Sequence, residues 1–162
     1  MLLSIYGMEL DMPKEYFVSI TKGSLYFKGD LEVSDHSKHI VQVFWDDLDE
    51  FKKVYSAPEE FFKDKVGAIE NDRDLVGIKT EVFSWAGADA NHPAHFHKIA
   101  YSTKKRLTKE LHHCMIGLLA FCEVCSRRYL LFNEYYENKN EFEETALKML
   151  GSFRCRCDRE ED

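Results

Sequence analysis

Residues 115–136 read MIGLLAFCEVCSRRYLLFNEYY, and this stretch decides the class of fold that we expect. Its first part, 115–121, is the longest apolar run in the chain. Such a short run suits a buried strand, whereas a membrane span needs about 18 residues. Residues 127–136 are rich in tyrosine, leucine and phenylalanine, which favour strands. We therefore expect two strands, over 115–122 and 127–136.

Further segments rich in β-forming residues lie on the N-terminal side of this stretch. They predict strands over 16–21, 24–28, 40–45, 76–85 and 94–102.

Three other segments carry apolar residues at helical spacing. They predict helices over 48–55, over 58–69 with a capping box from Ser56 to Glu59, and over 140–153. A strand-rich chain with helices in its middle and at its end is typical of an α+β fold rather than a doubly wound one. We expect an antiparallel β-sheet sandwiched by helices.

Length and composition indicate one folded unit. The chain has 162 residues, of which 44% are hydrophobic, enough for a core and too many for a disordered chain. No linker or repeat divides it, so we expect a single layered domain over 1–162, with 1–10 and 156–162 as candidates for flexible ends.

Charge and targeting signals narrow the classes of protein. Lysine and arginine number 22 against 29 acidic residues, a formal charge of −7, which argues against nucleic-acid binding. The N-terminus lacks the basic and apolar regions of a signal peptide, and no apolar run suits a membrane. We expect a cytoplasmic protein, no nucleic-acid or membrane partner, and thiols that are reduced or bind a metal.

Several segments resemble PsbP/Mog1-like domains. These are RYLLF (128–132) followed by a helix that ends in MLGSFR (149–154), together with GSLYF (23–27) and VQVFW (41–45) nearer the N-terminus. The resemblance implies an α/β/α sandwich around an antiparallel sheet. It also implies a small non-enzymatic accessory or assembly protein with a protein partner.

Four of the five cysteines form two closely spaced pairs. Cys122 and Cys125 form a CxxC pair, and Cys155 and Cys157 form a CxC pair. Two such pairs can supply a tetrahedral zinc site, and a final helix antiparallel to the strand 127–136 would bring them to one end. Because residues three apart on a straight strand face opposite ways, the chain must turn between Cys122 and Cys125 for a four-thiolate site to form. Free thiols and disulfides are the alternatives.

A second group of candidate ligands lies in the segment NHPAHFH (91–97). His95 and His97 share one face of the predicted strand, so both rings could reach one ion. No HExxH motif accompanies them, and histidines at the start of a strand are more often structural. They are secondary metal candidates, as are the donors in the segment HHC (112–114).

These patterns support three functional hypotheses. Since no catalytic motif is present, the first is a non-enzymatic binding or accessory domain that meets a protein partner. The second is a protein with a structural zinc site at Cys122, Cys125, Cys155 and Cys157. A hydrolase or redox enzyme is ranked last. Zinc is the only cofactor that the sequence suggests.

Overall fold

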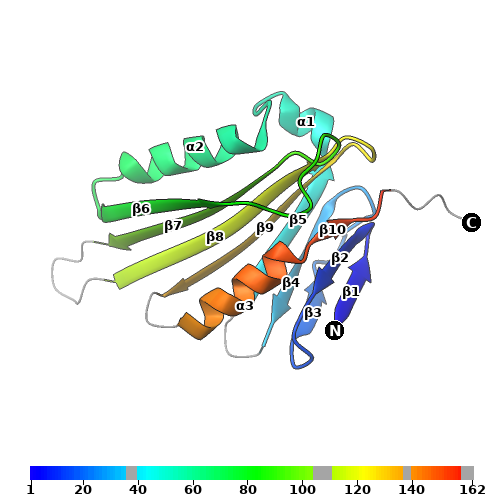
Figure 1. Ribbon diagram of the computed structural model, residues 1–162, viewed down its shortest axis with the longest axis horizontal. Coiled ribbons are helices and arrows are strands. Elements are labelled where there is room, and N and C mark those ends of the chain that lie inside the picture. Colours follow the sequence, from blue (N-terminus) through cyan, green and yellow to red (C-terminus); the bar gives the residue numbers. More distant parts are fainter. Residues whose placement is uncertain (36–39, 104–110, 137–139, 158–162) are drawn as a thin grey trace, which may run out of the picture.

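A long antiparallel sheet forms the body of the molecule (Figure 1). The computed structural model describes residues 1–35, 40–103, 111–136 and 140–157. Within these ranges, seven strands pair in the order β3-β4-β5-β9-β8-β7-β6. Their bounds are β3 (Phe17–Ile20), β4 (Gly29–Ser34), β5 (Ile40–Asp47), β6 (Leu75–Phe83), β7 (Ala94–Thr103), β8 (Leu111–Cys122) and β9 (Arg127–Tyr136).

Helices cover the two faces of this sheet. Helix α2 (Pro58–Glu70) packs on β6, β7 and β8, with the short α1 (Leu48–Lys52) beside it, and α3 (Asn140–Gly151) packs on β8 and β9 from the other face (Figure 1). The alternation along β8 shows why both faces are buried. Ile116 and Leu118 face the core below α3, whereas Leu119 and Phe121 join Phe62 of α2. The predicted α+β class, an antiparallel sheet sandwiched by helices, is confirmed.

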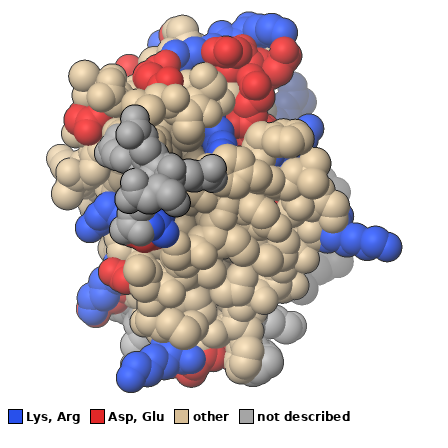
Figure 2. Space-filling view, turned by 90° about the vertical axis from the view of Figure 1, so that its right-hand side faces the viewer, with Lys and Arg blue, Asp and Glu red and all other residues tan. Residues whose placement is uncertain are grey.

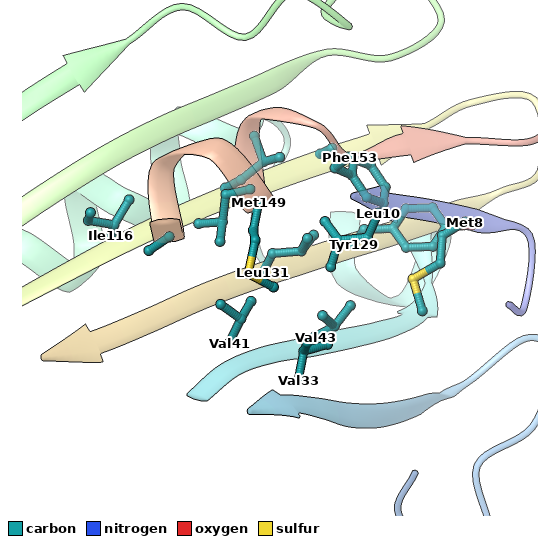
Figure 3. Close-up of a cluster of buried hydrophobic side chains, with 14 of the residues drawn as sticks. Met8, Leu10, Val33, Val41, Val43, Ile116, Tyr129, Leu131, Met149 and Phe153 are labelled. Atoms are coloured by element: carbon teal, nitrogen blue, oxygen red, sulfur yellow. The ribbon is translucent and has the colours of Figure 1, made fainter. Parts of the chain in front are cut away.

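A smaller sheet closes one end of the core. Strands β1 (Leu2–Ile5), β2 (Met8–Asp11) and β10 (Arg154–Cys155) pair in the order β1-β2-β10. Met8 and Leu10 of β2 are buried against Tyr129 and Phe153 in the cluster below α3 (Figure 3). Residues 2–5 and 8–11 are therefore strands of a sheet. The flexibility suggested for residues 1–10 stays a prediction. Of the other suggested flexible segment, residues 158–162 lie outside the described residues.

Two local predictions were wrong. Residues 24–28 form a turn closed by a bridge between Leu25 and Lys28, and the next strand begins at Gly29. Leu25 is 52% exposed, because this β-forming segment finds no partner strand to cover it. Ser56 is not the N-cap of α2; that residue is Ala57, and the Ser56 amide and hydroxyl both donate to the carboxylate of Glu60.

The surface is uneven in charge. Figure 2 shows that the side lying to the right in Figure 1 carries a broad area without acidic or basic side chains.

Among the described residues, no helix is both long enough and apolar enough to span a membrane.

Candidate metal centre

The CxxC pair lies at the turn between β8 and β9. Cys122 is the last residue of β8 and is 1% exposed, while Cys125 is partly exposed. The turn that converging cysteines require is present without glycine or proline, because Ser126 adopts a left-handed φ of 50°. The amide of Cys125 donates to Cys122 Sγ at 3.4 Å, which fixes both residues in the same turn.

The CxC pair is held in place by the small sheet. After α3, the buried Phe153 anchors the chain, and β10 pairs Cys155 with Met8 of β2. The Arg156 amide then donates to the Gly7 carbonyl at 2.9 Å. Gly7 has a φ of 74°, and a Cβ at this position would lie 3.0 Å from the guanidinium of Arg127. The glycine between β1 and β2 therefore lets this turn lie against Arg127 and bind the backbone between Cys155 and Cys157.

The two pairs converge at one end of the core. Cys125 Sγ lies 3.7 Å from Cys155 Sγ, and none of the five cysteines forms a disulfide. The donor atoms of four residues lie within 4.8 Å of one another: His92, Cys122, Cys155 and Cys157. The sequence predicted the four cysteines as one group. The structure adds His92 to that group, with Cys125 directly beside it.

His92 belongs to the candidate segment 91–97, but the sequence does not predict it as a partner of the thiols. It lies in the loop before β7, and its Nε2 is 3.0 Å from Cys157 Sγ. The register explains its position. Ala94 of β7 pairs with Ala120 of the antiparallel β8, so position 92, two residues before Ala94, lies opposite Cys122, two residues after Ala120. The Glu123 amide donates to the Asn91 carbonyl at 2.9 Å, which continues this pairing beyond the strands. Only the register could have pointed to His92.

An acidic residue orients the His92 ring. Asp89 Oδ1 lies 3.0 Å from His92 Nδ1 and accepts hydrogen bonds of 2.8 Å from the amides of Asn91 and His92. Desolvation raises the pKa of Asp89, but the hydrogen bonds from Asn91 and His92 outweigh it and lower the pKa overall. An ionised Asp89 accepts a hydrogen bond from the Nδ1–H group, which leaves Nε2, on the side of the thiols, with its lone pair. A carboxylate paired in this way is typical of metal-binding histidines.

The thiols share their protons unequally. Hydrogen bonds with the side chains of Cys125 and Cys155 lower the pKa of Cys122, whereas hydrogen bonds with Cys122 and Cys125 raise the pKa of Cys155. The cluster therefore favours a thiolate at Cys122, its most deeply buried member. Below it, the Tyr129 hydroxyl lies 3.7 Å from Cys155 Sγ and 3.4 Å from the buried guanidinium of Arg127, which supplies positive charge beside the sulfurs.

The second candidate pair, His95 and His97, lies on the opposite face of the sheet. These residues pair with Leu119 and Gly117 of β8 and face α2, whereas Cys122 faces the core below α3. Their rings lie 3.1 Å apart between His95 Nε2 and His97 Nδ1, and both contact the ring of Phe62. Burial lowers the pKa of both histidines. The sheet thus separates them from the thiols.

The HHC segment also lies apart from the cluster. His112 Nδ1 is 2.7 Å from Ser102 Oγ, and His113 Nδ1 is 3.4 Å from Glu134. Cys114 is buried and pairs with Ala100 of β7. These residues belong to the opposite half of β8 from Cys122.

No family model and no curated protein sequence matches the chain. The resemblance to PsbP/Mog1-like domains therefore stays a prediction. The geometry itself provides one nitrogen and three sulfur donors close enough together for a metal ion.

Proposed function

We propose that this chain is a zinc protein in which His92, Cys122, Cys155 and Cys157 bind one structural zinc ion. The observation that carries the proposal is the mutual approach of these four donor atoms within 4.8 Å. Zinc takes four ligands in a tetrahedron and accepts three thiolates and one imidazole. Soft sulfur ligands in this number favour zinc over magnesium or calcium, which prefer oxygen.

The origin of the ligands indicates what the ion does. They come from the loop before β7, from the end of β8 and from the segment after α3. A zinc ion there links the C-terminal segment to the end of the large sheet. Because its four positions are filled by protein, the ion has no open position for a substrate, which is the arrangement of structural rather than catalytic zinc.

A second ligand set differs in one member. Two sulfurs on one tetrahedral zinc lie about 3.8 Å apart, and Cys125 and Cys155 are 3.7 Å apart. This contact favours the four-cysteine set that the sequence predicts. Asp89 favours the set with His92, because its carboxylate already orients the ring towards the thiols.

Zinc content measured on single variants tests both points. Protein purified without added zinc should contain about one zinc per chain, and less than about 0.2 would contradict the proposal. Cys122→Ser and Cys157→Ser should lose the metal, whereas Cys114→Ser is the matched control and should keep it. If Cys125→Ser loses zinc and His92→Gln keeps it, the four-cysteine set is the correct one.

The role as an accessory domain with a protein partner stays a prediction, as does the cytoplasmic location. A structural zinc site is compatible with both.

A further inference from the structure

We propose that Cys125 is a site of oxidation by hydroperoxides, and that the disulfide it then forms with Cys155 releases the metal. The inference rests on the proposed zinc site with His92, Cys122, Cys155 and Cys157 as its ligands. It makes Cys125 a site of oxidative modification and makes the binding of the structural zinc ion sensitive to hydroperoxides.

The cluster contains more donor side chains than one zinc ion can bind. A tetrahedral zinc ion has four positions, and the cluster contains five donor side chains. The four with mutual distances within 4.8 Å fill those positions, which leaves the Cys125 thiol next to the ion without a place on it. Cys125 is not a lone cysteine, since its sulfur lies 3.7 Å from that of Cys155.

Cys125 is accessible from the surface. Cys125 lines a surface cavity of about 590 Å³, together with Tyr26, Asp46 and Arg127. Hydrogen peroxide is far smaller than this cavity and can reach the sulfur through it. Cys122, in contrast, is only 1% exposed. Susceptibility of a thiol to oxidation follows its exposure. Cys155 and Cys157 are also partly exposed, but both are zinc ligands in the proposed site, so Cys125 is the accessible thiol of the cluster that is not a ligand.

The chemistry needs one equivalent of peroxide and takes two steps. The Cys125 sulfur attacks one oxygen of hydrogen peroxide, the O–O bond breaks, and the products are a sulfenic acid at Cys125 and water. The Cys155 thiolate then attacks the Cys125 sulfur, the S–O bond breaks, and one proton is taken up as water leaves. Two cysteine sulfurs are thus oxidised by two electrons in total, and the peroxide is reduced to two water molecules.

The geometry permits the second step. A disulfide bond is about 2.05 Å long, so the two sulfurs must approach by about 1.7 Å from their present separation. Cys125 is partly buried in a surface turn, where a rotation of its side chain can provide part of this movement. Cys155 is a zinc ligand in the proposed site, so the new bond removes one of four ligands. The ion then has three protein donors and dissociates more readily.

The test compares zinc release from the full-length zinc-loaded wild type, Cys125→Ser and, as the matched control, Cys114→Ser. Each is treated with hydrogen peroxide, and zinc release is followed with a chromogenic chelator. The wild type and Cys114→Ser should each release about one zinc per chain, whereas Cys125→Ser should release it at least about tenfold more slowly. Peptide mapping of the oxidised wild type should find Cys125 linked to Cys155, and a thiol reductant should restore zinc binding.

The outcomes separate this inference from the zinc site itself. If Cys125→Ser loads no zinc, Cys125 is a ligand, and both the proposed ligand set and this inference fail. If Cys125→Ser loads zinc but releases it as fast as the wild type, only the inference fails. A wild type that keeps its zinc, or a disulfide between another pair of cysteines, also overturns the inference and leaves the zinc site intact.

Discussion

Strand β7 begins between two groups of candidate metal ligands that are assembled in different ways. On one face of the sheet, His92 meets three cysteines from two other segments, and Asp89 orients its ring. On the other face, His95 and His97 come from a single strand and contact each other and Phe62. The first group is a candidate zinc site, and the second is a pair of histidines packed under a helix.

The difference shows what a pattern in the sequence can and cannot indicate. Two histidines two residues apart share a face of any strand, so their proximity needs no tertiary structure. A zinc site needs four donors, and the remaining donors must come from elsewhere in the fold. Two cysteine pairs on separate segments are stronger evidence because their meeting is part of the topology.

Removal of the metal should have the largest effect. If free zinc exceeds its dissociation constant about a thousandfold, binding stabilises the native state by about 4 kcal/mol. For a chain of 162 residues this corresponds to a fall of about 8–16 °C in thermal midpoint when a strong chelator is added, measured by differential scanning calorimetry. Added zinc should restore the midpoint. An unchanged thermal midpoint after chelation would mean that the cluster of His92 and the cysteines does not stabilise the fold through a metal. It would then not differ from the His95 and His97 pair in this respect.

Truncation of Phe62 should destabilise the histidine side without affecting the metal. Phe62 is 2% exposed and lies against His95, His97 and the glycine at 117. Phe62→Ala should lower the free energy of unfolding by about 3–4 kcal/mol, measured by urea denaturation, with zinc content unchanged. Val82→Ala is the control, because Val82 borders the surface cavity that His95 and His97 line but is 62% exposed, so its truncation should cost less than about 0.5 kcal/mol. Loss of zinc from well-folded Phe62→Ala would show that the two groups are coupled.

Asp89→Asn should weaken zinc binding while leaving the fold intact. The variant keeps the size of the side chain but loses the charge that holds the proton on His92 Nδ1. A lost hydrogen-bond partner of a metal ligand typically reduces affinity by about 10–100-fold, which competition with a chromogenic chelator can measure. Asp72→Asn is the control, because Asp72 accepts a similar amide hydrogen bond in the turn before β6. Equal affinities for the two variants would argue against His92 as a ligand.

Much of the fold could be predicted because it depends on local patterns. The strand over 127–136 and the helix that begins at Asn140 follow directly from β-forming residues and from apolar spacing. The segment 24–28 shows the limit of such patterns. Its residues favour strands, but no strand pairs with them, and Leu25 instead accepts a hydrogen bond from Trp45 Nε1 at 2.9 Å. The outcome there depends on neighbours that a local pattern does not specify.

The candidate site divides in the same way. The cysteine pairs were visible as spacings, and their approach follows from a helix that returns along β9. His92 was not visible as a ligand, because its place opposite Cys122 depends on the exact register of β7 on β8. A shift of one residue would turn each side chain to the other face, and no local signal fixes that shift.

Replacement of the histidine pair should have the smallest effect at neutral pH. His95→Gln/His97→Gln should retain about one zinc per chain, because the sheet separates these residues from the thiols. Its effect on stability should depend on pH. Burial lowers the pKa of both histidines in the native state, so below about pH 6.5 the unfolded chain binds protons that the native pair resists. The native state therefore keeps its full stability above about pH 6.5. It loses stability relative to the unfolded chain as the pH falls towards the lowered native pKa values of His95 and His97.

Other titratable residues border the cavity that His95 and His97 line, namely Glu59, Glu60, Lys63 and Glu70. They are present in both the wild type and the double variant, so the difference in pH dependence between the two proteins reports on the histidine pair alone. Urea denaturation at pH 7.5 and 5.5 should show a larger loss of stability for the wild type than for the double variant. Equal losses would mean that the pair titrates normally in the native state. A loss of zinc from the folded double variant at neutral pH would contradict the separation of the two groups by the sheet, since no other contact described for His95 or His97 leads to the thiols.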